Sequence, residues 1–351
     1  MADLKSYLER AVGDQASDIF IVAGCPISEK LDGHIRPLEP DKLLPPDTEK
    51  LIREIYTLAK RPMDHYTSTG DDDFSFAIPG LSRFRVNAYR QRGSLAAVVR
   101  VVSFDIPKWE DIHIPEQVMA LSEITHGMIL FTGTAGSGKS TTQACIIDRI
   151  NRNRDCHIIT LEDPIEYLHR NQRSIVSQRE IAIDTADYLS ALRSCLRQAP
   201  DVILLGEMRD AETIRTAITA AETGHTVIAT MHTKGAVNAI DRVIDSFSGA
   251  HQAQIRFQLA TVLRTVVSQQ MIPDIAGNVI PAFELMHINS SIRGMIRDNK
   301  NHQIENAITA GRSEGMLTMD QSILELYRKG LITKETALNY ADHPDQLSRH
   351  L

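Results

Sequence analysis

The segment from Gly133 to Ser140, GTAGSGKS, has the residue types and the spacing of a phosphate-binding loop, G-x-x-x-x-G-K-[ST]. Glycines let backbone N–H groups turn toward phosphate oxygens. Lys139 offers a positive charge to the β- and γ-phosphates, and the hydroxyl group of Ser140 is a ligand for Mg²⁺. The sequence therefore predicts a site for ATP and Mg²⁺. Its candidate nucleotide-binding residues are Gly133, Thr134, Ala135, Gly136, Ser137, Gly138, Lys139, Ser140 and Thr141.

The residues around this loop favour a nucleotide site over a chance match. Met128–Phe131 is a short apolar run that is typical of a buried parallel strand. Residues 140–150 carry apolar side chains at helical spacing, so we expect a helix there. Its N-terminus would direct the positive end of the helix dipole at the phosphates. A glycine-rich turn with an incidental lysine is the alternative, and the order of strand, loop and helix argues against it.

Polar residues follow three other apolar runs of the chain. Glu162, Asp163 and Glu166 follow Ile158–Leu161, Glu207 follows Val202–Leu205, and His232 follows Thr226–Thr230. In parallel α/β sheets, functional residues gather at the carboxyl ends of strands. An ATP hydrolase must hold Mg²⁺ and orient one water for in-line attack, and acids beside the phosphates can do both.

We therefore assign candidate catalytic roles to three of these residues. Glu207 is the best candidate for activating the water, and Glu166 for binding Mg²⁺ and its waters. His232 could sense the γ-phosphate or hold a carboxylate in place. Each also has a structural alternative. Glu207 could cap the helix that begins near Asp210, Glu166 could be a surface acid, and His232 could be a hydrogen-bonded core histidine.

Gly206 departs from the pattern of many P-loop enzymes, in which the second motif ends in Asp-Glu. Here Gly206 occupies the Asp position before Glu207. The usual acid behind the magnesium ligands is therefore missing from this strand. We expect Asp163 or Glu166 to supply that acid instead.

The composition places the chain among globular proteins of more than one domain. It has 351 residues, of which 42% are hydrophobic and 24% charged, enough for two or three domains. No run of 18 apolar residues and no signal-peptide pattern occur, so we expect a cytosolic protein. The four cysteines form no C-x-x-C pair, which argues against a zinc site. A net charge of −7 argues against direct binding of nucleic acid.

The pattern of elements predicts an α+β domain over residues 1–102. We expect amphipathic helices at 4–12 and 46–59, and strands at 18–22, 27–31, 74–78, 82–89 and 95–102. Residues 103–116 contain Pro107, Trp109 and Pro115 and are predicted to be a linker, with an ordinary surface loop as the alternative.

Residues 117–288 are predicted to form an α/β core. Short apolar strands at 128–131, 157–161, 202–205 and 226–230 alternate with helices at 140–150, 186–197 and 210–223. Such alternation favours a parallel sheet between two layers of helices. Residues 289–351 are predicted to be mostly helical, with helices at 289–298, 303–309, 318–329 and 333–341.

Four motifs in order resemble those of the secretion ATPases of type IV pilus and type II secretion systems. Residues 133–140 match the Walker A motif, 160–166 resemble the Asp box, 204–210 an atypical Walker B motif and 224–233 the His box. Within that superfamily the chain is most similar to PilT-type pilus-retraction ATPases. Residues 16–18 and 82–87 resemble their N-terminal domain, and residues 318–321 and 327–332 their C-terminal helices. The longer N-terminal region and the four-cysteine module of assembly-type relatives are not present.

The resemblance implies a PAS-like α+β N-terminal domain, a RecA-like P-loop NTPase domain and a helical C-terminal region. It implies a homohexameric ATPase motor that powers pilus retraction and twitching motility. Its partner would be an inner-membrane platform protein, at the cytoplasmic face of the membrane. Arg83, Arg85 and Arg100 match basic positions from which such an N-terminal domain can reach the phosphates of a shared site. A solvated strand face is the alternative for these arginines.

Three other functions compete with this interpretation. Pilus-assembly and type II secretion ATPases share the same motor core, so the direction of pilus motion rests on the family resemblance. An accessory docking subunit would need little turnover, and the intact Lys139, Glu166, Glu207 and His232 argue against it. A nucleic-acid motor of the RecA type is disfavoured by the acidic net charge and by the lack of a basic-aromatic strand-binding segment.

Overall fold

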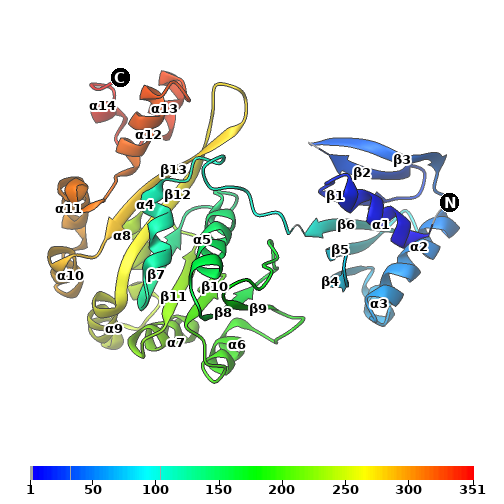
Figure 1. The fold of residues 1–351 in the computed structure, drawn as a ribbon, viewed down its shortest axis with the longest axis horizontal. Helices are drawn as coiled ribbons and strands as arrows, with labels where there is room; N and C mark the ends of the chain where they lie inside the picture. The colour runs from blue at the N-terminus through cyan, green and yellow to red at the C-terminus, as the bar shows by residue number, and fades with distance from the viewer. Residues whose placement is uncertain (1–2, 32, 103) are drawn as a thin grey trace. The chain divides into compact units, whose positions relative to one another are not determined.

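The computed structural model describes residues 3–31, 33–102 and 104–351, so residue 103 of the predicted linker lies outside the described residues (Figure 1). The chain divides into two compact units, the first comprising the residues up to Asp105 together with residues 166–168, and the second comprising residues 106–165 and 169–351. Each unit has its own hydrophobic core. Among the described residues, we find no helix whose length and apolar character would suit a membrane span.

The first unit is an antiparallel sheet with helices on one face. Its elements are α1 (Leu4–Gly13), β1 (Asp18–Ile21), β2 (Pro26–Leu31), β3 (His34–Lys42), α2 (Pro45–Leu58), α3 (Asp64–Thr69), β4 (Asp71–Ile78), β5 (Ser82–Gln91) and β6 (Ser94–Val102). The described strands form a sheet in the order β3-β2-β1-β6-β5-β4, in which every neighbour pair is antiparallel. The predicted α+β character of the N-terminal domain is confirmed.

Alternation along β5 gives this sheet one apolar and one polar face. Phe84 and Val86 are buried in one cluster with Leu8 of α1. Successive side chains of a strand point to opposite faces, so Arg83 and Arg85 stand on the face away from that cluster.

The second unit alternates strands and helices over most of its length. Its first elements are α4 (Glu116–Met119), a short 3₁₀ helix (Ala120–Glu123), β7 (Gly127–Thr132), α5 (Lys139–Asn153), β8 (His157–Glu162), β9 (Ile175–Glu180), α6 (Tyr188–Cys195), β10 (Val202–Leu205), α7 (Ala211–Glu222) and β11 (Thr226–Met231). They are followed by α8 (Ala236–Asp245), α9 (Gly249–Val262), β12 (Leu263–Pro273), β13 (Val279–His287), α10 (Ser290–Arg297), α11 (Ile304–Ala310), α12 (Met319–Arg328), α13 (Lys334–Tyr340) and α14 (Pro344–Leu347).

These elements form three layers, with one central sheet between two layers of helices. The strand order is β13-β12-β7-β11-β10-β8-β9, and neighbours are parallel except for the edge strand β13, which is antiparallel to β12. Met128 and Leu130 of β7 pack in the core shared with helices α6 to α11. Ile129 and Phe131 face the opposite way and pack with α4 and α5. The predicted α/β core with helices on both faces of the sheet is confirmed.

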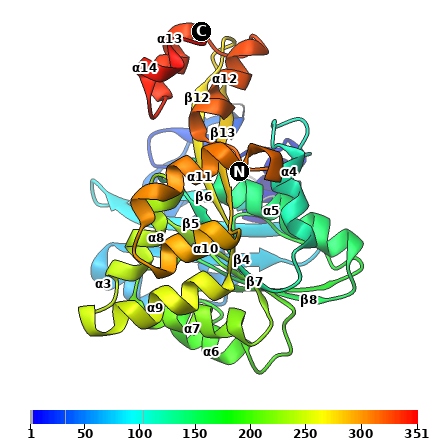
Figure 2. The same ribbon diagram turned by 90° about the vertical axis from the view of Figure 1, so that its left-hand side faces the viewer.

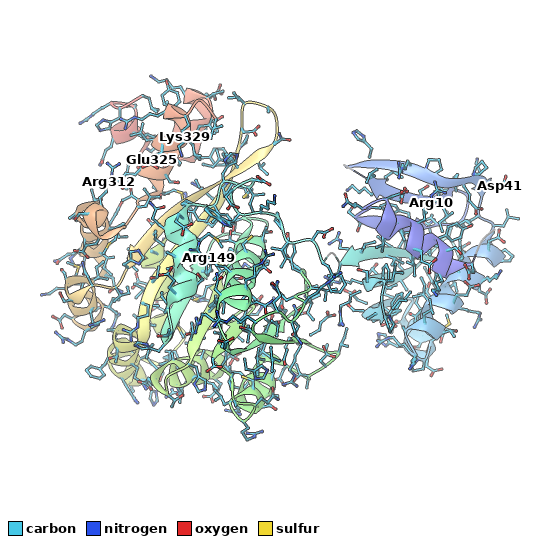
Figure 3. All side chains as sticks on the ribbon, viewed as in Figure 1. Arg10, Asp41, Arg149, Arg312, Glu325 and Lys329 are labelled. Carbon is cyan, nitrogen blue, oxygen red and sulfur yellow. The ribbon has the colours of Figure 1, made fainter. Side chains whose placement is uncertain are left out.

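Most of the stretch that we predict to be a linker packs against this second core. Ile106, Trp109 and Ile112 lie against the α4–α5 side of the sheet. The thiol of Cys145 on α5 donates to the carbonyl oxygen of Pro107 at 3.4 Å. Figure 3 labels Arg149 of α5, whose guanidinium forms an ion pair with Glu116 of α4 at 2.8 Å. Several contacts therefore fasten this stretch and α4 to the helix that follows the phosphate loop.

The C-terminal helices pack on the β12–β13 hairpin. Figure 2 shows α12, α13 and α14 beside the far end of this hairpin. Ile272 of β12 and Ile280 of β13 share a buried cluster with Ile323 of α12 and Ala337 of α13. The predicted helical C-terminal region is confirmed, and its helices pack on β12 and β13 at the edge of the sheet.

Candidate active site

Four neighbouring strands carry the candidate residues at their carboxyl ends. β7, β11, β10 and β8 lie side by side in this order and run in parallel. The phosphate loop follows β7, His232 follows β11, Glu207 comes two residues after β10, and Glu162 ends β8. Residues from distant parts of the chain therefore meet along one edge of the sheet, where α/β proteins bind ligands.

Lys139 is held inside the phosphate loop. It is the first residue of α5, and its side chain is buried. The ammonium group donates to the carbonyl oxygens of Gly133 and Thr134, each at 2.7 Å, and to the hydroxyl oxygen of Ser137 at 3.2 Å. The loop closes around a positive charge at the N-terminus of a 15-residue helix. Both features create positive potential where a phosphate would bind.

Strand β12 forms the floor of the loop. A Cβ at Gly133 would overlap the main-chain carbonyl oxygen of Gln269, and a Cβ at Gly138 would lie 2.8 Å from the side-chain amide nitrogen of Gln269. Gly138 also has φ of 82°, in the region that favours glycine. The amide oxygen of Gln269 accepts a hydrogen bond from Thr142 of α5 at 2.9 Å. Close packing against β12 therefore favours glycine at both positions.

A cavity of about 290 Å³ opens beside the loop, within the second unit. The start of α5 contributes Thr141 and Thr142, and β12 contributes Gln269 and Met271. Residues 111–114 also line the cavity. The cavity is thus continuous with the loop that would hold the phosphates, and its lining combines apolar and hydrogen-bonding groups.

Glu207 is nearly buried and flanked by two basic groups. Its side chain is 11% exposed. The guanidinium Nε of Arg209 forms an ion pair with Oε1 of Glu207, and Nε2 of His232 lies 3.4 Å from Oε2. The N–H of Met208 donates to the carbonyl oxygen of Thr230 at 3.0 Å, which ties this segment to the end of β11. A carboxylate fixed in this way can take a proton from a water.

His232 is neutral in this environment. Burial lowers the pKa of its imidazole, and the positive charges of Lys139 and Arg209 lower it further. A histidine with a lowered pKa is uncharged near pH 7 and has one nitrogen to donate and one to accept a hydrogen bond. His232 thus lies near Glu207 and near the cations Lys139 and Arg209 without adding a third positive charge to the site.

The backbone at Gly206 is closely packed, which leaves little room for a side chain at the position before Glu207. A Cβ there would lie 3.0 Å from the hydroxyl oxygen of Tyr188 and 3.1 Å from the carbonyl oxygen of Leu161. The N–H of Gly206 donates to that same carbonyl at 2.8 Å. Burial raises the pKa of Tyr188, and the nearby carboxylates of Asp163 and Glu162 raise it further. A side chain at this position would press on the hydroxyl of Tyr188 and on the backbone of β8.

Comparison with known proteins agrees with this arrangement. The family model described as type II/IV secretion system protein matches residues 1–330 of the chain. The chain belongs to the type II/IV secretion system protein family. The chain is 40% identical over 344 residues to the type IV pilus retraction ATPase PilT of Pseudomonas aeruginosa, a match that covers 98% of this chain and 99% of that protein. It is 38% identical to a twitching motility protein of Neisseria gonorrhoeae, over 98% of this chain and 90% of that protein.

A solved relative extends the similarity to three dimensions. The crystal structure of the pilus retraction motor PilT with bound ADP has a TM-score of 0.90 to this chain at 41% identity. The match covers 99% of this chain and 100% of that one. The family resemblance and the fold class inferred from the sequence are both confirmed.

Of the two glutamates in the Asp box, Glu162 lies at the end of β8, whereas Glu166 lies in the loop that follows. Thr160 donates to Oε1 of Glu162 at 2.5 Å, and the amide nitrogen of Gln178 lies 3.3 Å from the same oxygen. Glu166 is exposed in the loop beyond β8. Glu162 is thus fixed at the sheet edge, and the magnesium role of Glu166 stays a prediction.

The three candidate arginines share one face of the N-terminal sheet. Arg85 and Arg100 are directly paired across β5 and β6, and Arg83 stands two residues from Arg85. Arg85 forms an ion pair with Asp73 at 2.7 Å, and Arg100 with Asp18 at 3.0 Å. The strand register therefore groups these cations, and their role in catalysis stays a prediction.

Some contacts of the site are not indicated by the sequence. Arg209 lies within the 204–210 motif, but nothing in the sequence indicates its ion pair with Glu207. Gln269 and Tyr188 lie in no motif. Their positions follow from the fold, since β12 lies next to β7, which leads into the phosphate loop, and α6 packs against β8.

Proposed function

We propose that this chain hydrolyses ATP and uses the energy to power retraction of type IV pili. The observation that carries this proposal is the meeting of Glu207 and His232 beside the Lys139 loop. It occurs in a chain that is 40% identical, over nearly its whole length, to a pilus retraction ATPase. The site supplies the chemistry, and the relatives supply the process that the chemistry drives.

The residues at this edge of the sheet have different roles in ATP hydrolysis. The loop N–H groups and Lys139 hold the β- and γ-phosphates. Mg²⁺, when bound, offsets charge on the phosphate oxygens, with Ser140 and Glu166 as the residues that would hold it. Glu207 accepts a proton as a water oxygen bonds to the γ-phosphorus and the bond to the β-phosphate oxygen breaks. Neutral His232 keeps the Glu207 carboxylate oriented. The cavity beside Thr141 and Thr142 takes the nucleoside.

The active form in this proposal is a homohexameric ring. ATP binds where an N-terminal domain meets an ATPase domain, and one of Arg83, Arg85 and Arg100 reaches the phosphates there. The shared face of these arginines supports this role. An arginine that approaches the γ-phosphate is worth roughly 10³–10⁵ in rate in GTPases.

The ring works at the cytoplasmic face of the inner membrane in this proposal. It binds a platform protein of the pilus base rather than the lipid or a nucleic acid. The net charge of −7 supports a protein partner over a nucleic acid. Domain movements during the ATP cycle would act on that platform and remove pilin subunits from the pilus.

Deletion of the gene tests the proposed process. A retraction motor predicts cells that carry more pili than wild type and do not twitch. The wild-type gene should restore twitching, and a gene for Glu207→Gln should not. Bald cells would show an assembly motor instead. Restoration by Glu207→Gln would show an accessory subunit whose docking matters more than turnover.

A further inference from the structure

The loop after His232 rests on two buried side chains of neighbouring strands. Ser268 of β12 and Glu284 of β13 are directly opposite each other in the antiparallel ladder. Ser268 is 2% exposed and Glu284 is 9% exposed. Because paired residues of an antiparallel sheet point to the same face, the two side chains present their oxygens side by side.

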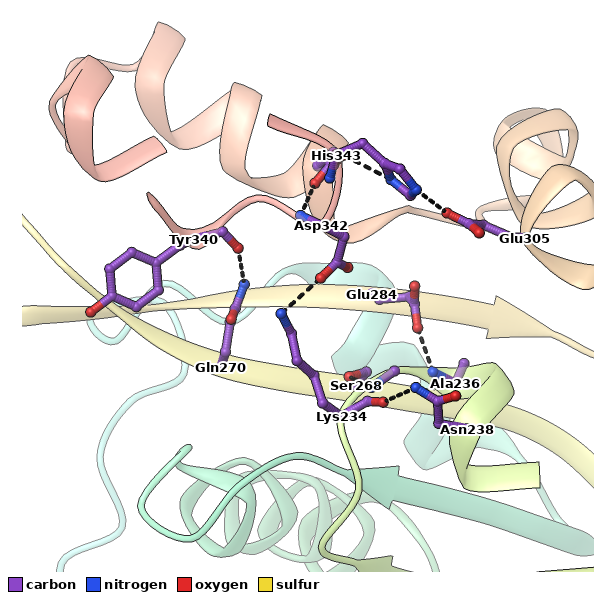
Figure 4. Close-up of polar contacts among 12 residues, drawn as sticks. Lys234, Ala236, Asn238, Ser268, Gln270, Glu284, Glu305, Tyr340, Asp342 and His343 are labelled. Atoms are coloured by element: carbon purple, nitrogen blue, oxygen red, sulfur yellow. Dashed lines mark hydrogen bonds and ion pairs between the residues drawn. The ribbon is translucent and has the colours of Figure 1, made fainter. Parts of the chain in front are cut away.

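Two successive backbone N–H groups of the loop bind this pair. Gly235 donates to the hydroxyl oxygen of Ser268 at 3.1 Å, and Ala236 donates to Oε1 of Glu284 at 2.6 Å (Figure 4). Ala236 is the first residue of α8, so its N–H belongs to the group that a helix leaves unsatisfied at its N-terminus. A buried acid that accepts such a hydrogen bond also complements the helix dipole.

The same loop is fastened to the phosphate-loop strand on its other side. The hydroxyl of Thr132, the last residue of β7, hydrogen-bonds to both the carbonyl oxygen and the hydroxyl oxygen of Thr233. Thr132 is fully buried. The segment between His232 and Ala236 is thus held by β7 at one end and by β12 and β13 at the other.

We propose that Ser268 and Glu284 are positioning residues for hydrolysis, which hold residues 233–236 so that His232 stays against Glu207. The inference rests on the proposed role of Glu207. Neither residue belongs to a motif that the sequence identifies, and neither contacts the phosphate loop in the described structure. They act on the reaction through the backbone of the loop. A displacement of a reacting group by about 1 Å can cost on the order of 10²-fold in rate.

A second contact of this loop serves as an internal comparison. The ammonium of Lys234 forms an ion pair with Asp342 at 2.8 Å, and the two side chains are 55% and 34% exposed (Figure 4). Exposed ion pairs contribute little free energy. The buried Ser268 and Glu284 therefore contribute more to the placement of the loop than this ion pair does, and loss of the Asp342 contact should change the rate little.

Steady-state kinetics of full-length variants test the proposal. Glu284→Leu removes the acceptor for Ala236 at similar volume, and Glu284→Gln keeps an acceptor oxygen. Ser268→Ala removes the acceptor for Gly235. We expect Glu284→Leu and Ser268→Ala to lower kcat by about tenfold while the KM for ATP changes by less than about threefold. Glu284→Gln should keep most of the wild-type kcat.

The matched control is Ser322→Ala. Ser322 is also buried, and its hydroxyl oxygen accepts the N–H of Phe283 on β13 at 3.0 Å, away from the loop. It should leave kcat unchanged, as should Asp342→Asn. The proposal is overturned if Ser268→Ala and Glu284→Leu keep the wild-type kcat, or if Ser322→Ala lowers kcat as much as Ser268→Ala does.

Glu207→Gln, measured in the same assay, separates this inference from the proposed function. An inactive Glu207→Gln beside unimpaired Ser268→Ala and Glu284→Leu would overturn the positioning role alone. An active Glu207→Gln would overturn the proposed site, and with it this inference. If Glu284→Leu does not fold, Ser268→Ala decides the question by itself.

Discussion

Glu207 and His232 face each other from the ends of the neighbouring strands β10 and β11, with His232 Nε2 3.4 Å from Glu207 Oε2. The carboxylate is nearly buried, and the imidazole is neutral because burial and two nearby cations lower its pKa. A neutral imidazole can orient the carboxylate by a hydrogen bond without becoming its permanent ion-pair partner. Arg209 pairs with Oε1 of Glu207, so Oε2, the oxygen that faces His232, is the one available to take up a proton, as a general base requires.

Lys139→Ala should weaken ATP binding by roughly ten- to a hundred-fold, because a charge-assisted hydrogen bond contributes about 1.5–3 kcal/mol. The variant also loses the hydrogen bonds from the ammonium group to Gly133 and Thr134 that close the loop. Titration with a labelled nucleotide measures the effect. Lys334→Ala, at an exposed lysine of α13, is the control and should bind as wild type does. Near-wild-type affinity of Lys139→Ala would refute the assignment of the loop.

Gly206→Ala should lower the free energy of unfolding by about 1–3 kcal/mol, as overpacking of a close-packed site does. The new methyl group would press on the hydroxyl of Tyr188 and on the backbone of Leu161. Gly249→Ala is the matched control, because its Cβ meets no atom within 4 Å at the start of α9. Urea denaturation measures both variants. Equal stability of the two would mean that Gly206 is not required by packing.

The sequence predicts strands best where both faces are buried. β7, β8, β10 and β11 are short apolar runs, and each lies within one residue at either end of its predicted range. β3 and β9 were not predicted, because β3 is an edge strand with mostly exposed side chains and prolines at 37 and 40, and β9 is half-buried and polar. β12 was not predicted either, because Ser268, Gln269 and Gln270 interrupt its apolar pattern. Two of these polar residues support the candidate site, because Gln269 packs against the phosphate loop and Ser268 binds the loop after His232.

The parts of the site that lie within short continuous segments could be predicted from the sequence. The phosphate loop, Glu207 and His232 each follow a short apolar run, so the sequence shows both the end of a strand and the polar residue beside it. Gln269, Tyr188 and Glu284 act through contacts between segments far apart in the chain. Those contacts depend on the strand order, and no local spacing encodes that order.

Removal of the positive charge from the N-terminal arginines tests the shared site. If one of Arg83, Arg85 and Arg100 reaches the γ-phosphate, its change to Gln should lower kcat more than it weakens ATP binding. The charge matters most as negative charge shifts in the transition state. Arg90→Gln is the control, because Arg90 alternates to the opposite face of β5.

Mixed rings show whether the arginine acts across a subunit boundary. Partial recovery of hydrolysis on mixing an inactive arginine variant with Glu207→Gln subunits would place the two groups in one site from different subunits. If all three arginine variants kept the wild-type kcat, the arginines would be a solvated strand face and the N-terminal domain a docking or mechanical element.

Glu284 should make stability fall as pH rises toward neutrality. Burial raises the pKa of Glu284 from 4.5 to about 7, with the carboxylates of Asp342, Glu305 and Asp320 adding to the shift and the N–H of Ala236 opposing it. The folded protein keeps this proton where the unfolded chain has lost it. The contribution is therefore full below about pH 4.5 and is lost as pH rises through about 7.

Glu284→Gln removes that titration. The free energy of unfolding of the wild type, taken relative to Glu284→Gln, should decrease by at most about 1.4 kcal/mol for each pH unit between about pH 5 and about pH 7. Urea denaturation of both proteins across this range measures it. Parallel pH profiles of the two proteins would contradict the raised pKa.

Hydrolysis by full-length Glu207→Gln, beside ATP binding by the same protein, tests the central claim most directly. The amide keeps the size and the hydrogen-bond reach of Glu207 but cannot accept a proton. We predict that the variant binds ATP as the wild type does and hydrolyses it more slowly by roughly 10²–10⁴-fold, the usual cost of losing a general base. Turnover within a few-fold of wild type would contradict the account and make Glu166 the better candidate for the base.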